Sequence, residues 1–470
     1  MPPPTANDPR ADAPLIFHGG MVGAVLPLVL FLAGVVWLGL AGAPDERGFW
    51  PVLVAALALG LILARDRTAY SETLIQGMSQ PIVMIMIMAW LLAGILASLM
   101  NASGFVEALV WAARQAGVAG GGFAVASFLI ACLVSTSTGT SLGTLILCSP
   151  LLYPAGGALG TDPAILIGAI LGGATFGDNV SPVSDTTIAS ALTQQADIRG
   201  VVWSRLRYAL PAAAVAMVAY GVLGGGGQPA AEAAVVTGSP KGLPMLAAPI
   251  VAIALLLRGR HLLHGLFGGI LTATGLGLVL GLIQPAQLLR IDAASYAAQS
   301  LYIDGIGRGI GVSIFTILLM GLIAGFEATG AMDRLLQFAG ERIRSAAGAE
   351  WWIFAAVSAA VLLTTHPVVA ILAVGPLALA TGRQFGIDRY RRSNILDVTV
   401  CTYPFFLPYF IPAIIAASTT ADAGGFGMPR LSPFTAGIYN FHSWALLAVM
   451  VISIATGFGR SGADTQTTQG

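Results

Sequence analysis

One stretch of eleven residues combines groups that a membrane-embedded helix rarely tolerates. Residues 177–187 read Gly-Asp-Asn-Val-Ser-Pro-Val-Ser-Asp-Thr-Thr, and they hold two carboxylates, Asp178 and Asp185, together with a proline and four hydroxyls. Apolar runs flank the stretch at 164–175 and 188–192. A charge at the bilayer centre costs about 2.5–3.5 kcal/mol, so both acids need a cation or a proton to compensate them. The stretch therefore predicts an ion site.

Pro182 predicts where the helix opens. Its ring lacks an N–H and clashes with the carbonyl four positions earlier, which belongs to Asp178, and Ser181 before it is pushed away from helical geometry. We expect the helix to break between Gly177 and Ser184 and to expose backbone carbonyls. Carboxylate, carbonyl and hydroxyl oxygens are the ligands that hard cations prefer. With Asp178 and Asp185, this interpretation makes Asn179, Ser181, Ser184, Thr186 and Thr187 candidate site residues.

Capping is the alternative explanation for part of this stretch. Ser184 or Asp185 is a good N-cap for a second half-helix, because its side chain is able to accept backbone N–H bonds. Capping does not explain Asp178, which would lie at a helix C-terminus, where negative charge is unfavourable.

The composition excludes a soluble protein. Of 470 residues, 56% are hydrophobic and 9% charged, and the mean hydropathy is +0.83, whereas soluble domains carry about 25% charged residues. We expect an all-α, polytopic transmembrane protein. The formal net charge is zero, which gives no reason to expect a nucleic-acid partner, and the three cysteines lack metal-ligand spacing. No cofactor, nucleophile elbow or metal motif is indicated, so we expect no enzyme activity.

The chain divides into spans and polar interruptions. A span takes about 20 apolar residues, and the candidates are 21–42, 49–64, 80–100, 205–224, 243–257, 262–283, 309–326 and 441–458. Two longer segments, 164–195 and 395–421, contain polar breaks. Two pairs of short arms are typical of hairpins: 123–138 with 142–156, and 351–363 with 368–381. The hairpins either re-enter the membrane or cross it twice, and the sequence leaves this open.

The two hairpin tips extend the list of candidate ligands. Hydroxyls crowd the first tip, residues 135–141, and the candidates there are Thr136, Ser137, Thr138, Thr140 and Ser141. The second tip offers Thr364, Thr365 and His366, and Tyr403 stands at the second break. His366 is either a proton carrier, since histidine titrates near neutral pH, or a residue bonded to backbone. Asp397, close in sequence to Arg391 and Arg392, is interpreted as structural.

A constant offset of 226 residues indicates an internal repeat. Gly104, Thr138, Pro150, Gly156, Gly160, Asp162 and Pro182 recur as Gly330, Thr364, Pro376, Gly382, Gly386, Asp388 and Pro408. We therefore expect a first half at 15–225, a linker at 226–240 and a second half at 241–460, with disordered ends at 1–14 and 461–470. If each hairpin returns to its starting side, each half crosses the membrane five times, and an odd number of crossings makes the halves inverted. The acids do not recur, because Asp178 corresponds to Pro404.

Loop charge predicts the orientation. Under this topology sixteen Arg residues, among them Arg205, Arg391 and Arg392, fall on one side, against six Arg and Lys on the other. The positive-inside rule then places both termini and the richer side in the cytoplasm. We expect a multi-pass protein of the cytoplasmic, or inner, membrane.

Two motifs resemble those of NhaC-type Na+/H+ antiporters. Residues 177–187 resemble the family's Gly-Asp-(Lys/Arg)-x-Ser-Pro-Leu-Ser-Asp-Thr-Thr, and residues 138–144 resemble its Thr-Gly-Thr-Ser-Trp-Gly-Thr. The resemblance implies a Na+ site formed by Asp178 and Asp185 with help from the turn that includes Thr138. This chain departs from the pattern at Asn179, where the family places a basic residue, and at Leu142, where it has tryptophan.

The leading hypothesis is a secondary transporter that exchanges Na+ for H+. The family resembled also includes sodium-linked malate/lactate exchangers. The alternative is therefore a sodium- or proton-coupled carrier of a small organic solute, a carboxylate or an amine, packed beside Tyr403, Phe405, Phe406 and Tyr409. A homodimer remains open.

Overall fold

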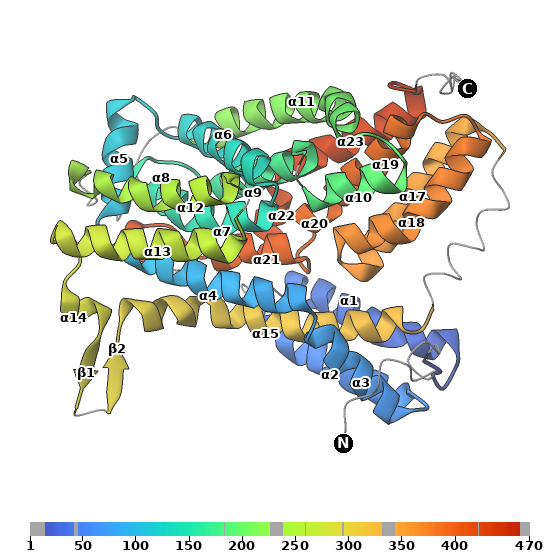
Figure 1. The fold of residues 1–470 in the computed structure, drawn as a ribbon, viewed down its shortest axis with the longest axis horizontal. Coiled ribbons are helices and arrows are strands. Elements are labelled where there is room, and N and C mark those ends of the chain that lie inside the picture. The colour runs from blue at the N-terminus through green and yellow to red at the C-terminus, as the bar shows by residue number, and fades with distance from the viewer. Residues whose placement is uncertain are drawn as a thin grey trace. The chain divides into compact units, whose positions relative to one another are not determined.

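The computed structural model describes residues 15–41, 46–182, 184–225, 238–258, 260–293, 296–330, 344–421 and 423–460. The expected disordered ends and most of the expected linker lie outside these residues. Figure 1 shows that helices supply nearly all of the regular structure. Among the described residues, nine segments are long and apolar enough to cross a membrane. The expectation of a polytopic helical membrane protein is confirmed.

The chain forms two compact units, which are described separately. The first comprises residues 1–42, 48–84 and 314–342. Its helices are α1 (Met21–Leu40), α2 (Phe49–Leu63) and α3 (Arg67–Met78). The sequence patterns did not predict α3, which begins at Asp66, whose carboxylate accepts the backbone N–H groups of Thr68 and Ala69.

The second unit comprises residues 43–47, 85–313 and 343–470 and contains the predicted site. Its first part holds α5 (Phe105–Gln115), α6 (Gly121–Thr138), α7 (Ser141–Leu152), α8 (Ala155–Ala158), α9 (Pro163–Val180), α10 (Asp185–Thr193), α11 (Ile198–Leu223), α12 (Ala247–Leu257), α13 (Leu262–Val279) and α14 (Pro285–Leu288). After these come α17 (Ala346–Thr364), α18 (Pro367–Gln384), α19 (Arg389–Val400), α20 (Tyr403–Phe406), α21 (Ile411–Ser418), α22 (Pro433–Ile438) and α23 (Phe441–Thr456). Two helices, α4 (Pro81–Ala102) and α15 (Leu301–Glu327), contribute residues to both units. A short antiparallel hairpin, β1 (Arg290–Asp292) with β2 (Ala297–Gln299), pairs Arg290 with Gln299 and was not expected.

The 226-residue offset recurs in the local structure. Asp162 caps α9 and Asp388 caps α19, each by accepting the N–H three residues on. Gly160 and Gly386, two residues before these caps, both have positive φ, at 63° and 65°. Equivalent turns therefore introduce equivalent helices in the two halves of the sequence.

The hairpins differ from their predicted form. The first polar tip was expected to be a turn over 135–141, but α6 continues to Thr138, and the hydroxyl of Thr138 donates to the carbonyl of Val134 at 2.8 Å. That bond lets a Ser/Thr-rich end stay helical, so the turn itself is Gly139 and Thr140. In the second hairpin, α17 and α18 have 19 and 18 residues, several more than the arms predicted at 351–363 and 368–381.

Packing between α6 and α9 holds the predicted break against the first hairpin. Figure 1 shows the two helices, in teal, side by side. A Cβ atom added at Gly177 would lie 2.2 Å from the Cβ of Ser135, and the Ser135 hydroxyl donates to the Ala174 carbonyl at 2.7 Å. A cluster of buried apolar side chains continues this contact onto α11: Ala124, Phe128, Cys132, Ile165, Ala169, Ala213, Ala216 and Tyr220.

Gly177→Ala should lower stability, because the added methyl has no room against Ser135. Overpacking of this kind costs about 1–3 kcal/mol, and we expect a lower melting temperature for the purified protein. Gly221→Ala is the matched control, since its Cβ would lie 3.6 Å from Val125, an ordinary contact with the same α6 helix. Equal melting temperatures for the two variants would contradict the packing argument.

Candidate functional site

The predicted break is present at the predicted place. Helix α9 ends at Val180 and α10 begins at Asp185. Between them Ser181 and Ser184 have extended backbones, with ψ of 131° and 139°. The Ser181 N–H donates to Gly177, and Pro182 has no N–H to donate to Asp178. The local rule for proline is thus sufficient to explain the opening.

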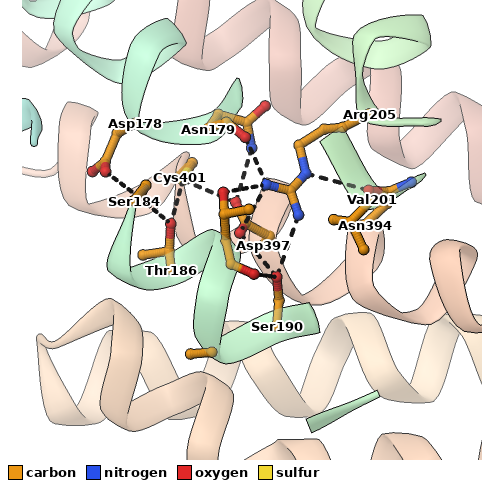
Figure 2. Close-up of polar contacts among 12 residues, drawn as sticks. Asp178, Asn179, Ser184, Thr186, Ser190, Val201, Arg205, Asn394, Asp397 and Cys401 are labelled. Atoms are coloured by element: carbon orange, nitrogen blue, oxygen red, sulfur yellow. Dashed lines mark hydrogen bonds and ion pairs between the residues drawn. The ribbon is translucent and has the colours of Figure 1, made fainter. Parts of the chain in front are cut away.

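Hydroxyl groups surround the carboxylate of Asp178. Its Oδ2 accepts the Ser141 hydroxyl from the first hairpin at 2.7 Å, and its Oδ1 accepts the Ser184 hydroxyl from the break, also at 2.7 Å. The Ser184 and Thr186 hydroxyl oxygens lie 3.1 Å apart (Figure 2). Within the described part of the chain, Asp178 forms no ion pair. Its negative charge is therefore hydrogen-bonded but not neutralised by a basic side chain.

The capping explanation for the break is wrong. Ser184 occupies the N-cap position of α10, but its side chain accepts no backbone N–H and instead donates to Asp178. Asp185 is the first helical residue of α10 and is exposed. It forms no hydrogen bond or ion pair with the residues that the structure describes. Its position in the first turn is favourable for a negative charge, so Asp185 remains available to a ligand.

Other predicted residues of the first hairpin lie near the same turn. Thr136 is half-buried in α6, while the Ser137 side chain lies outside the described part. Thr140 is the N-cap of α7 and accepts the Gly143 N–H at 3.2 Å. Among the described hydrogen bonds, only Ser141 links this hairpin directly to Asp178.

A second polar cluster, centred on a buried ion pair, lies on the other side of the break. The Arg205 guanidinium, on α11, pairs with the Asp397 carboxylate, on α19, at 3.0 Å, and both side chains are 0% exposed (Figure 2). Arg205 also donates to the Asn179 carbonyl at 2.6 Å and to the Thr187 hydroxyl at 2.8 Å. It thus fixes the last turn of α9 and the first turn of α10 to the second half of the chain.

Further side chains of this cluster form hydrogen bonds with both members of the ion pair. Asp397 accepts the Asn179 amide at 3.0 Å and the Ser190 hydroxyl at 3.1 Å. Arg205 donates in addition to Ser190 at 3.3 Å and to the Asn394 side chain at 3.2 Å. Asn179 therefore binds the ion pair, and its side-chain oxygen points away from Asp178 in Figure 2.

The expectation for Arg205 needs correction, because Arg205 was placed among the loop charges. Asp397 was interpreted as structural, and its basic partner is Arg205 on α11. Helix α11 begins at Ile198, seven residues before Arg205, so Arg205 lies inside the helix and is buried. Arg391 and Arg392 are also buried, at 1% and 5% exposure. None of the three is a loop charge, although the charge excess keeps its direction without them.

The candidate residues of the second half form their hydrogen bonds with groups other than Asp178. Thr365 ends α17 with a left-handed backbone, φ 53°, and the Thr364 hydroxyl donates to the Ala360 carbonyl at 2.8 Å. His366 is the N-cap residue of α18, and its buried Nδ1 has no partner among the described residues. Ser358 donates to the Tyr403 hydroxyl at 3.2 Å. No described hydrogen bond joins these four residues to Asp178.

The aromatic residues expected to contact an organic ligand at the second break make contacts within the protein. Phe406 stacks on Trp444 with 4.1 Å between ring centroids, and Tyr409 donates to the Leu362 carbonyl at 3.2 Å. Phe405 and Tyr409 are 1% and 6% exposed. Phe405, Phe406 and Tyr409 thus pack the second break against the protein, whereas Tyr403 is half-buried.

The first half of the chain is similar to one family of known proteins. Residues 20–225 match the model of the Na+/H+ antiporter family. The chain is 27% identical over 197 residues to the malate-2H+/Na+-lactate antiporter of Bacillus subtilis, covering 42% of this chain and 41% of that protein. It is 36% identical over 135 residues to the Na+/H+ antiporter NhaC of Alkalihalophilus pseudofirmus, covering 29% of each. The matched stretches span less than half of either relative.

Two matches cover nearly the whole chain. The arginine/ornithine antiporter ArcD of Halobacterium salinarum is 24% identical over 461 residues, which is 90% of this chain and 92% of that protein. The crystal structure of the Alcanivorax borkumensis YdaH transporter aligns with 92% of this chain and 98% of its own, at 14% identity and a TM-score of 0.42. The resemblance to NhaC-type antiporters, inferred from two motifs, is confirmed over the first half.

Arg205→Gln should destabilise the protein strongly, since it leaves Asp397 charged and unpaired in the interior. Breaking a buried pair costs about 3–5 kcal/mol. We expect little folded protein, measured by size-exclusion recovery and melting temperature. Arg207→Gln, an exposed change on the same helix, is the control. Adding Asp397→Asn to Arg205→Gln should restore much of the loss, and a double variant no more stable than the single one would contradict the pairing.

Proposed function

We propose that this chain, whose residues 20–225 match the model of the Na+/H+ antiporter family, exchanges Na+ for H+ across the cytoplasmic membrane. The family match and the NhaC relative support sodium-coupled antiport. The observation that carries the proposal is the hydroxyl-lined carboxylate of Asp178, which has no basic partner in the described structure. A transported cation or proton supplies the missing positive charge.

The hydrogen bonds around Asp178 leave oxygen lone pairs for a cation. Ser141 and Ser184 each point their hydroxyl proton at the carboxylate, and Thr138 points its proton at a backbone carbonyl. A hydroxyl that donates its one proton still has two acceptor lone pairs. Na+ held by Asp178, with Asp185 and Thr138 as further ligands, would meet oxygen atoms already oriented for it.

Competition at Asp178 supplies the exchange mechanism. A carboxylate holds either a proton or a metal ion in the same lone-pair region, so binding one releases the other. The Arg205–Asp397 pair keeps the neighbouring acid neutralised, which leaves Asp178 and Asp185 as the carboxylates that change partner. Alternating access then exposes the occupied break first to one side of the membrane and then to the other.

The two halves are proposed to be inverted repeats, 15–225 and 241–460, with both termini in the cytoplasm. The recurring caps Asp162 and Asp388 support the repeat. The excess of Arg that remains on one side supports the orientation. In such repeats the binding site lies near the bilayer midplane at discontinuous helices. The break between α9 and α10 is such a helix.

Exchange of a small organic solute is the second candidate. Two relatives carry organic solutes in their names, one malate and lactate and the other arginine and ornithine. The burial of Phe405, Phe406 and Tyr409 at the second break does not add support for a solute site there. Vesicles that contain the protein distinguish the two candidates. Uptake of a labelled solute coupled to a Na+ or H+ gradient favours solute exchange, and Na+-driven proton movement without any solute favours Na+/H+ exchange.

Asp178→Asn should abolish Na+-driven proton movement in vesicles that contain the purified protein, because the amide neither takes up a proton nor supplies a charge. Asp185→Asn should raise the Na+ concentration at half-maximal rate, since Asp185 adds attraction without direct hydrogen bonds. Asp304→Asn, an exposed change on α15, is the control. Full exchange by both site variants would refute the assignment.

Competition also predicts a pH effect that is independent of any variant. Lowering the pH on the side of Na+ entry should raise the apparent KM for Na+ and leave the maximal rate nearly unchanged, because protons occupy Asp178. Rate measurements over a grid of Na+ and proton concentrations test this. A fall in maximal rate at constant KM would mean that the two ions use different sites.

A further inference from the structure

A short β-hairpin lies in the connection between two of the apolar helices and presents an exposed apolar face. Strands β1 and β2 follow α13 and precede α15, and both helices are long and apolar enough to span a membrane. The ladder pairs Ile291 with Ala298 and Arg290 with Gln299. Paired residues lie on the same face of a hairpin, and successive residues alternate between its faces. Ile291 and Ala298 therefore share one face, and Arg290 and Gln299 share the other.

The apolar face is exposed along the ladder. Leu289 has an extended backbone just before β1, so it continues the alternation onto the face of Ile291. The exposed fractions are 61% for Leu289 and 74% for Ile291, and Ala298 is also exposed. Tyr296, just before β2, is 96% exposed. A two-stranded hairpin is at best marginally stable in water by itself and is stabilised by packing against another surface. We therefore expect a further layer to cover this face.

Hydrogen bonds fix the base of the hairpin near the end of α13. The Ser300 hydroxyl donates to the Leu288 carbonyl at 2.5 Å and accepts the Tyr302 N–H at 3.0 Å. The Tyr302 and Thr274 hydroxyl oxygens lie 2.8 Å apart. Thr274 precedes Val279, the last residue of α13, by five positions, or about 8 Å along the helix axis. The hairpin thus begins close to the level at which that span ends.

The hairpin also runs across the direction of the span. Figure 1 shows β1 and β2 extending across the axis of α13, not along it. A hairpin with this direction lies along the surface of a bilayer that α13 crosses. Apolar side chains are exposed on α13 and just beyond it, at 70% for Leu271, 83% for Val279 and 47% for Leu280. Exposed apolar surface therefore extends from the span past its end and resumes on the hairpin.

The size of the face favours lipid over a protein partner. A stable protein–protein interface buries about 800 Å² on each partner and involves about 20–30 residues a side. The ladder face offers three side chains, with Tyr296 beside them. An element that lies in the headgroup layer needs no such area, because its apolar side chains enter the bilayer one by one. Tyrosine is also enriched at that layer.

We propose that the hairpin lies on the phospholipid headgroup layer at the membrane face where α13 ends. Leu289, Ile291 and Ala298 enter the boundary between the headgroups and the acyl chains. Arg290 and Gln299, on the opposite face, remain in water. The hairpin thereby anchors the connection between α13 and α15 to the bilayer. This interaction goes beyond the proposed exchange of Na+ for H+ and does not depend on it.

Matched labels on neighbouring residues of β2 test the proposal. Ala298→Cys and Gln299→Cys, in the full-length protein in phosphatidylcholine–phosphatidylglycerol vesicles, each receive a thiol-reactive fluorophore. Lipid with a spin label beside its headgroup should quench the fluorophore at position 298 about twofold more than the one at position 299, and aqueous iodide should give the reverse order. The unaltered protein is the labelling control, because Cys132, Cys148 and Cys401 are buried.

A carboxylate added to either face distinguishes the two faces. Ile291→Asp, combined with Ala298→Cys, should lower the lipid quenching at position 298 to the value at position 299, because a charge is costly in the apolar part of the bilayer. Gln299→Asp, combined with Ala298→Cys, is the matched control and should leave the quenching unchanged. Equal quenching in these two double variants would contradict the assignment of the faces.

Three results of the labelling experiment would overturn the proposal. Equal lipid quenching at positions 298 and 299 would mean that neither face is directed at the membrane. Strong iodide quenching at both positions would place the whole hairpin in water. Protection of position 298 from both quenchers would mean that protein covers the face, and cross-linking between two copies of the Ala298→Cys variant would identify that protein as a second copy of this chain.

Discussion

The buried pair of Arg205 and Asp397 is the interaction on which the site depends. Two charges without solvent exposure persist only when each satisfies the other and their remaining hydrogen-bonding positions are filled. Here the carbonyl of Asn179 and the hydroxyl of Thr187, one from each side of the break, accept hydrogen bonds from the guanidinium. An opened helix would otherwise leave polar backbone groups unpaired at membrane depth. The pair therefore holds the break open in a defined shape.

The pair also determines which carboxylate lacks a basic partner among the described residues. Asp397 has a basic partner and three further donors, from Asn179, Ser190 and Cys401. Asp178 has only the two serine hydroxyls among the described residues. A carboxylate already paired with arginine has little to gain from Na+, whereas an unpaired one gains the full attraction. In the proposed mechanism, charge compensation, more than the number of carboxylates, determines where the cation binds.

The sequence was sufficient for the features that local rules govern. Pro182 and its apolar flanks predicted the break, and the hydroxyls at residues 135–141 predicted a partner for it, because proline geometry and spacing act within a few residues. Arg205 and Asp397 were missed because 192 positions separate them, and their partnership depends on how α11 packs on α19. The one local signal was the Asp197 cap, which starts α11 early enough to carry Arg205 into the helix.

Asn179, where this chain departs from the resembled pattern, contacts the buried ion pair. The resembled family places a basic side chain next to the first acid, and this chain has asparagine there. In this chain Arg205 contacts the backbone and, through Asp397, the side chain of that same asparagine. A cation fixed by a carboxylate on a separate helix interacts less with Asp178 than a flexible one beside it would. In the proposed exchange, Asn179 leaves Asp178 without a fixed charge beside it, so that a transported cation or proton supplies the compensation.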